Sequence, residues 1–399
     1  MATNDLQKTL VLKADLKTVL WTLSLPAMAA MVLFGLNAFM DTVYIGQLMN
    51  QTALAGIALA YPLTNIVMGI GTWAGTGAGN LLSIVLGRAD ESTQGRIVGN
   101  ATIFMLVATA LFAVPSYFLA APLIALMGCE WDVLTYGVTY FKVTLLGAPF
   151  WVYGLTLNFI VRSEGKMKEA AIMMSHGLVV NLVLTPIFIR YGDMGIAGAA
   201  WATNIGMLIY CIVGYRYFKS GKASFESNIN ALVFDPFVVV SIAKLGFPGF
   251  ILNLMGLVQA MVVFNVITTI GTEDELAFFA AANRIQLFLV TPLFGLMRAL
   301  QPVAGINFGA GQYDRVKASF VLFCKTGFYI IAPFWLLLTL FPASSLQLVL
   351  PDMAFSELQL WHFRVYSLML PCFPVVFMAL TYLPAIEQPQ YASMVALAR

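Results

Sequence analysis

Residues 19–48 read VLWTLSLPAMAAMVLFGLNAFMDTVYIGQL and contain one charged side chain, that of Asp41. A helix rises about 1.5 Å per residue, so about 20 apolar residues already cross a hydrocarbon core of roughly 30 Å. In lipid every backbone N–H and C=O must be satisfied within the protein, which leaves helices and closed barrels. Barrel strands alternate over about ten residues, whereas this run is continuously apolar. The stretch therefore predicts a transmembrane helix.

Runs of the same kind recur along the 399 residues. The predicted spans are 19–48, 53–86, 97–127, 133–161, 169–189, 196–218, 236–270, 276–302, 317–341 and 358–383. Of all residues, 60% are hydrophobic and 10% are charged. A soluble protein has about 25% charged residues, so most of this surface cannot face water. The predicted fold class is an all-α polytopic membrane protein.

Basic residues gather on one side of these spans. The N-terminal segment and the loops after even-numbered spans hold fourteen of the 21 Lys and Arg, and the opposite loops hold only Arg190. Cytoplasmic loops carry the excess of Lys and Arg. The pattern predicts a cytoplasmic N-terminus in the cell membrane.

The chain also repeats itself at an offset of 222 residues. Pro26 matches Pro248, Leu54-Ala55 matches Leu276-Ala277, and Gly87 matches Gly309. Six spans separate the copies, so both have the same orientation, as in two-lobed transporters built from parallel repeats. We expect a six-helix lobe over 1–222 and a second, incomplete lobe over 223–399, with four helices and the start of a fifth.

The sequence gives no support to an enzyme or to an ATP-driven pump. A phosphate-binding loop of the form G-x-x-x-x-G-K-[ST] is missing, and His176 and His362 are far apart in the chain. The four cysteines show neither disulfide nor metal spacing. We expect no cofactor, no resident metal and no nucleic-acid partner. An ion gradient, or none, would then drive transport.

Asp41 is the one acidic residue well inside a predicted span, about eight residues or roughly 12 Å from its end. Such charges are costly and usually face a bundle interior or a wet cavity. Asp41 is therefore a candidate proton carrier or cation ligand. Polar residues predicted at similar depth are Asn37, Tyr44, Asn65, Asn181, Thr185 and Thr203.

The second lobe has no acid inside its spans. We expect Arg298 to extend to the cytoplasmic edge, and we leave open whether Arg284 closes the cavity or only pairs with a carbonyl. The full set of candidates for a substrate cavity is Asn37, Tyr44, Asn65, Tyr153, Asn158, Gln259 and Arg284. On span 53–86, Gly71, Gly75 and Gly79 predict close helix packing.

Several short motifs, in order, resemble the multidrug and toxic compound extrusion (MATE) family along essentially the whole chain. They are Leu25-Pro26, Asp41-Thr42-Val43-Tyr44-Ile45-Gly46, Gly69-Ile70-Gly71, Leu86-Gly87, Arg162-Ser163-Glu164-Gly165, Gly195-Ile196-Ala197-Gly198-Ala199-Ala200, Gln301-Pro302 and Asn307-Phe308-Gly309-Ala310-Gly311. The resemblance implies two pseudo-symmetric six-helix lobes forming a V. It implies twelve helices, so the last two would be absent here.

The resemblance also implies an ion site in the first lobe at Asp41, Asn181 and Thr203. Many relatives carry Asp in the pattern N-x-x-x-D-P, where this chain has Thr185 before Pro186. A single carboxylate favours H⁺ over Na⁺ as the coupling ion, although Na⁺ at Asp41, Asn181 and Thr203 stays open.

The predicted function is a cation-coupled antiporter, a monomer in the bilayer, that exports amphipathic and cationic drugs and toxic organic compounds. The alternatives are a flippase for lipid-linked oligosaccharide from the same superfamily, and a non-transporting membrane scaffold or fragment.

Overall fold

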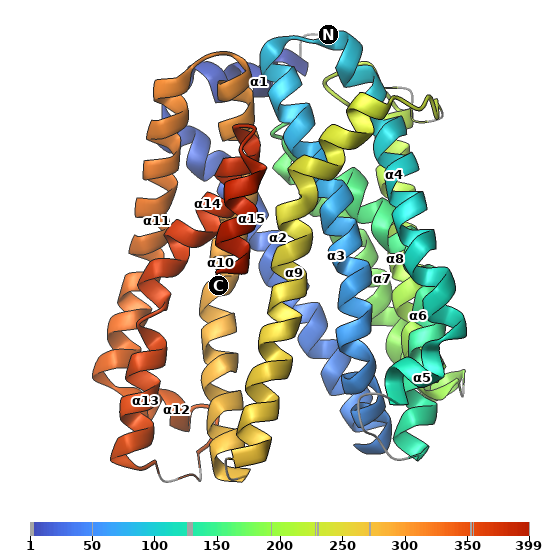
Figure 1. Cartoon of the computed structure of the whole chain (residues 1–399), viewed down its shortest axis with the longest axis vertical. Coiled ribbons are helices and arrows are strands. Elements are labelled where there is room, and N and C mark those ends of the chain that lie inside the picture. Colours follow the sequence, from blue (N-terminus) through green and yellow to red (C-terminus); the bar gives the residue numbers. More distant parts are fainter. Residues whose placement is uncertain are drawn as a thin grey trace.

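The computed structural model describes residues 4–49, 51–125, 131–192, 194–227, 229, 231–270, 273–351, 353 and 355–398, most of them helical (Figure 1). Ten helical segments within these ranges are long and apolar enough to cross a membrane, and they confirm the predicted spans. They are α2 (Leu16–Leu48), α3 (Gln51–Arg88), α4 (Glu91–Phe118), α6 (Trp131–Ser163), α7 (Met167–Pro186), α8 (Gly195–Lys219), α9 (Pro236–Ile270), α10 (Glu273–Gly309), α11 (Tyr313–Leu340) and the broken pair α13 (Glu357–Ser367) and α14 (Phe373–Ala385).

Proline and short helices modify the predicted pattern. The last span is broken between α13 and α14 by the turn η2 (Leu370–Cys372), where Pro371 and Pro374 lack the N–H that a helix interior needs. The third span stops at Phe118 and continues as α5 (Ala120–Ala125). Shorter elements are α1 (Asn4–Lys13), η1 (Ile187–Tyr191), α12 (Pro342–Gln347) and α15 (Pro389–Leu397). The N-terminal segment, for which the sequence predicted no helix, thus contains one.

The helices form two groups, which we call the first lobe (α2 to α8) and the second lobe (α9 to α15). The two groups pack against each other through several helices, among them α2 against α10 and α9 against α3. In the 222-residue repeat α2 corresponds to α9 and α3 to α10. The two crossings are therefore equivalent contacts, as two parallel repeats around a common axis would make.

Residue contacts at the two crossings are also related by the 222-residue repeat. A Cβ on Gly295 would lie 2.6 Å from the Cα of Met28, so α2 and α10 touch there. At the 222-residue offset these positions correspond to Trp73 and Phe250, whose rings lie 5.1 Å apart between α3 and α9. The repeat seen in the sequence is thus a repeat in space.

Glycines let the two lobes approach closely near the end that carries the N-terminus. A Cβ on Gly246 would lie 1.9 Å from the Trp73 carbonyl oxygen, and one on Gly77 would lie 2.0 Å from that of Ile242. Gly87 and Gly309, the pair matched by the repeat, face each other in the same way. No side chain fits at these positions, so backbone packs directly on backbone.

The glycines predicted to allow close packing on α3 do so against two helices. A Cβ would lie 3.0 Å from Leu155 at Gly71 and 2.5 Å from Phe159 at Gly75, both on α6. At Gly79 it would lie 2.6 Å from Nε2 of Gln301 on α10. The stripe therefore holds α3 against its own lobe and against the other.

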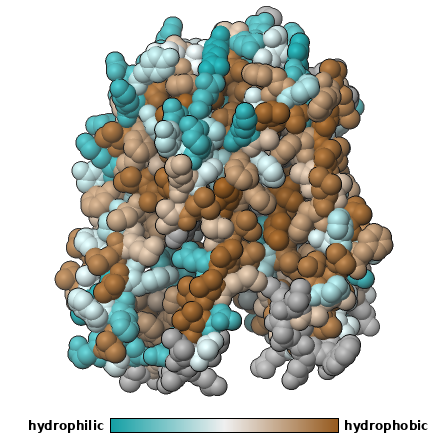
Figure 2. All heavy atoms as spheres, in the orientation of Figure 1, coloured by the Kyte–Doolittle hydropathy of each residue, from teal (hydrophilic) through white to brown (hydrophobic). Residues whose placement is uncertain are grey.

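The opposite end of the molecule is open. Figure 2 shows the two halves parting at the end away from the N-terminus, while apolar residues cover most of the middle of this face. Large exposed side chains on several helices, such as Leu111, Phe118, Phe237 and Phe288, are apolar. Apolar patches of this extent suit lipid rather than water.

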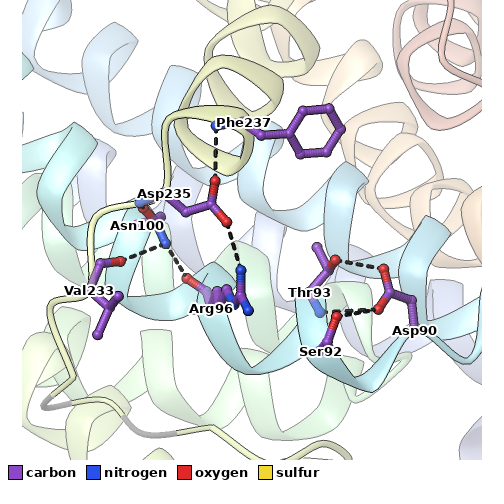
Figure 3. Close-up of polar contacts among 8 residues, drawn as sticks. All are labelled: Asp90, Ser92, Thr93, Arg96, Asn100, Val233, Asp235 and Phe237. Carbon is purple, nitrogen blue, oxygen red and sulfur yellow. Dashed lines mark hydrogen bonds and ion pairs between the residues drawn. The ribbon is translucent and has the colours of Figure 1, made fainter.

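The connection between the lobes is anchored on α4 (Figure 3). The amide oxygen of Asn100 accepts from the backbone N–H of Asp235 at 2.7 Å, and its nitrogen donates to the Val233 carbonyl at 3.0 Å. Arg96 forms an ion pair of 3.0 Å with Asp235. The other carboxylate oxygen of Asp235 accepts from the N–H of Phe237 in the first turn of α9. The start of the second lobe is thus fixed to the first.

Candidate functional site

Asp41 lies in the second half of α2, opposite the C-terminal end of α7. Its Oδ1 accepts a hydrogen bond from the Thr185 hydroxyl at 3.4 Å. Thr185 is buried, and its single hydroxyl proton is shared with the carbonyl of Asn181, one turn earlier and 2.9 Å away. Because residues four apart lie on the same helix face, Asn181 and Thr185 both face α2.

Asn181 connects three helices. Its Oδ1 accepts from the Asn37 amide at 2.8 Å when its nitrogen points to Thr203 of α8, 3.1 Å away. With oxygen and nitrogen exchanged, the nitrogen donates to Asp41 Oδ1 at 3.2 Å and the oxygen accepts from Thr203 Oγ1 at 3.1 Å. The network decides amide orientation, and the second arrangement gives the carboxylate a further donor.

Five residues predicted to lie near one another, Asn37, Asp41, Asn181, Thr185 and Thr203, thus form one cluster. No Lys or Arg forms an ion pair with Asp41 among the described residues. Tyr140 of α6 lies close enough to interact with its charge. Carboxylate, hydroxyl and amide oxygens suit a proton or a hard cation. Sequence reasoning missed Tyr140, since no pattern in the chain shows that this side chain of α6 packs near Ile45 of α2.

The other cavity candidates lie elsewhere. Tyr44 is half-buried one turn beyond Asp41. Asn65 lines a small cavity between α3 and α9 together with Phe250 and Asn253. The amide nitrogen of Asn158 is fully buried and donates to the Ala170 carbonyl at 2.7 Å, so it joins α6 to α7.

Tyr153 is half-buried and its hydroxyl hydrogen-bonds with Thr102 of α4, inside the first lobe. Gln259 on α9 and Arg284 on α10 are both exposed. The structure therefore brings none of these three, nor Asn158, into the Asp41 cluster.

A larger cavity of about 160 Å³ lies between the lobes, and Arg298 is among its lining residues. The guanidinium of Arg298 lies 5.9 Å from the ring of Phe159. The polar lining is Thr72, Thr76, Asn80, Asn253, Arg298, Gln301 and Thr381. Spacing along one helix could not show that α10 turns this arginine inward.

Glu164, in the loop between α6 and α7, is a buried acid outside the spans. It lies 3.4 Å from the ammonium of Lys166 and accepts from the Ser224 hydroxyl at 2.6 Å. Burial raises the pKa of Glu164, and its lysine and serine partners oppose that rise. Because Glu164 binds Ser224 in the connection between the lobes, we assign it a structural role.

Comparison with known proteins identifies relatives along most of the chain. The profile of the family described as MatE matches residues 26–187 and 247–399, two segments whose starts differ by about the repeat length. The multidrug export protein MepA of Staphylococcus aureus (strain NCTC 8325 / PS 47) is 27% identical over 300 residues, 74% of this chain and 66% of that protein. The chain thus spans about two thirds of the length of this curated relative.

Solved structures share the fold. A crystal structure of MATE in the bent conformation superposes with a TM-score of 0.90 at 21% identity, covering 98% of this chain and 86% of the other. The outward-facing conformation of a multidrug resistance MATE family transporter of the MOP superfamily gives a TM-score of 0.87 at 22% identity, with 98% and 87% covered. The two-lobed architecture is therefore the same.

Proposed function

The chain belongs to the MatE family of membrane transporters, which are not enzymes, and from this premise we propose that it is an ion-coupled antiporter exporting amphipathic organic compounds. The observation that carries the proposal is the Asp41 cluster, in which one carboxylate, with no basic partner in the described part of the chain, is held by Thr185 and Asn181. Multidrug export by the relative MepA supports the substrate class.

We propose H⁺ as the coupling ion, with Na⁺ as the alternative. One carboxylate can be neutralised by one proton, and the oxygens of Asn181 and Thr203 would complete a Na⁺ site. Protonation removes the charge that Thr185 and Asn181 bind, which frees α2 from α7. Because α2 also packs against α10 of the second lobe, its movement reaches the lobe interface and reorients the lobes.

The basic loops support an orientation of the protein in the membrane. With the N-terminus in the cytoplasm, the glycine contacts close the cytoplasmic end and the open end faces outward. The protein would lie in the cell membrane, act as a monomer with lobes over 1–222 and 223–399, and use no cofactor besides the coupling ion. A lipid-linked oligosaccharide flippase would need several basic groups for pyrophosphate, whereas the described lining has Arg298 alone.

The test is efflux of a cationic dye from proteoliposomes under an imposed pH or Na⁺ gradient. We expect the protein to export dye with one gradient and Asp41→Asn to lose this activity, because its amide cannot take up the proton. Asp314→Asn is the matched control, since Asp314 is exposed at the start of α11. Unchanged gradient-driven efflux by folded Asp41→Asn would refute the mechanism.

A further inference from the structure

The inter-lobe cavity contains an arginine with no acidic partner. No ion pair or hydrogen bond joins Arg298 to another described side chain, and its recorded contact is the ring of Phe159. A charge at this depth in a membrane protein is costly unless it meets an opposite charge or water. What neutralises Arg298 must therefore come from outside the described protein.

A second arginine strengthens the positive field. Arg162 is 3% exposed at the end of α6, lies 5.0 Å from the same Phe159 ring, and repels Arg298. Its Nη1 has no hydrogen-bond partner. Glu164, two residues on, is occupied by Lys166 and Ser224. The two guanidinium groups thus share one ring and have no carboxylate between them among the described residues.

Two buried amides line the cavity with unused polar atoms. Asn80 and Gln301 are each 3% exposed, and Asn80 Oδ1 and Gln301 Nε2 have no hydrogen-bond partner. Buried polar atoms are nearly always hydrogen-bonded, and an amide left unpaired costs about 1–3 kcal/mol. Because the amide of Asn80 can present either end, both side chains can donate to an acceptor beside Arg298.

Thr72, Thr76, Asn253 and Thr381 add further neutral polar groups, and the remaining wall is apolar. Leu245, Leu252, Phe294, Met297 and Leu380 come from α9, α10 and α14 of the second lobe. The lining therefore combines a cationic donor and neutral amides with a hydrophobic wall, which is the usual composition of a small-molecule site. No carboxylate is among the described lining residues, so those residues supply no negative charge to hold a cation.

We propose that this cavity binds the acidic group of an amphipathic substrate, a carboxylate, sulfonate or phosphate, at Arg298, Asn80 and Gln301. The apolar part of the molecule lies against α9, α10 and α14. This inference rests on the proposed function and extends its substrate class from cations to organic acids and zwitterions. Proton coupling stays at Asp41, in a different part of the first lobe, and cation export does not depend on the acid site.

The experiment measures binding in phosphatidylcholine nanodiscs by calorimetry without any ion gradient. Three probes share one ring system: naphthalene-2-sulfonate, neutral 2-naphthylmethanol and cationic 2-naphthyltrimethylammonium. We expect the sulfonate to bind at least about tenfold more tightly than the neutral probe, because charge-assisted hydrogen bonds are roughly twice as strong as neutral ones. Equal binding of the three probes, or preference for the cation, would overturn the proposal.

Variants locate the site. Arg298→Met should remove the preference for the sulfonate, Arg298→Lys should keep part of it, and Gln301→Leu should weaken it without changing the charge. Lys244→Met is the charge control, because Lys244 is exposed on α9. Should Arg298→Met fail to fold, Arg298→Lys and Gln301→Leu still test whether these residues bind the sulfonate. Sulfonate affinity that is unaffected in both would refute the assignment.

Two further outcomes separate related explanations. Displacement of the sulfonate by added phosphatidylglycerol would assign the acidic group to a lipid headgroup, and lack of displacement would assign it to a soluble organic acid. Both uphold the anion site. If sulfonate binds but gradient-driven efflux fails, the site stands and the antiport proposal falls. If efflux of a cationic dye succeeds and the sulfonate does not bind, the antiport proposal stands and the anion site is refuted.

Discussion

At the scale of single residues, the position of a hydroxyl decides what Asp41 can do. The resemblance to the family places Thr185 where many relatives carry a second acid. Its single hydroxyl proton is shared between Asp41 Oδ1, at 3.4 Å, and the Asn181 carbonyl of its own helix, at 2.9 Å. A neutral donor beside one carboxylate permits a one-proton switch, whereas a second carboxylate would compete for that proton. The hydroxyl group of Thr185, rather than the volume of its side chain, therefore determines how many protons the cluster can bind.

Replacing Thr185 by valine keeps the shape and removes the donor. We expect coupled efflux to fall by roughly tenfold, the equivalent of about 1.4 kcal/mol, since a hydrogen bond to a charged group contributes about 1.5–3 kcal/mol. Thr185→Ser should retain most activity. Initial rates of dye efflux measure this, and equal rates for valine and threonine would show that the bond plays no part.

At the scale of elements, backbone contacts between helices fix the lobes. The α3–α9 crossing has no room for a side chain at Gly246, where a Cβ would lie 1.9 Å from the carbonyl oxygen of Trp73. Ten residues further along α9, Gly256 has nothing within 4 Å of its Cβ position. The same helix thus has one glycine, Gly246, that cannot be replaced by a larger residue without a shift, and another, Gly256, that can.

Gly246→Ala should lower the thermal unfolding temperature, because α9 must move away from α3 to accept the methyl group. Gly256→Ala should leave it unchanged or raise it, since alanine favours a helix over glycine by about 1 kcal/mol. Unfolding monitored by tryptophan fluorescence in detergent compares the two. Equal melting would contradict the close crossing.

The linker anchor should depend on pH. A hydrogen bond from Arg96 and bonds from the first turn of α9 lower the pKa of Asp235 below its usual value. An acid with a lowered pKa stabilises the fold above its unfolded pKa, about 3.9, and this contribution is lost as pH falls through the folded value.

We therefore expect hydrogen exchange at residues 231–240, corrected for the intrinsic pH dependence, to lose protection below about pH 4. Asp235→Asn should show reduced protection already at neutral pH and no further change from this group. A protection profile that is the same in both proteins at pH 7 would rule out the anchor.

At the scale of the whole molecule, the closed end is reinforced across the lobes. Arg88 at the end of α3 forms an ion pair of 2.8 Å with Glu387 before α15. The guanidinium of Arg315 on α11 donates to the carbonyls of Val11 and Ala14, which hold α1 over this end. Opening this side requires these contacts to separate, so they favour the conformation described here.

Arg315→Gln should detach α1 and shift the lobes toward opening at the N-terminal end. Loss of hydrogen bonds from a charged donor costs about 1.5–3 kcal/mol, enough to change a population ratio by about tenfold or more. Distances between spin labels on the two lobes measure the shift. Lys317→Gln, two residues further along α11 at an exposed position, is the control, and matching distance distributions in the two variants would contradict this role for α1.

The sequence by itself determined the spans, the basic side, the parallel repeat and the family, because hydrophobic length, loop charge and motif order are local properties that survive without knowledge of packing. It also picked out Asp41 and its neighbours on α7 and α8, since depth in a helix follows from counting residues. Only the tertiary structure decided which way each helix turns. That rotation brings Tyr140 within range of the charge of Asp41, places Arg298 in the cavity between the lobes and lets Asn158 join two helices. A side chain's neighbours depend on how its helix packs against other helices and not on its position in its own helix alone.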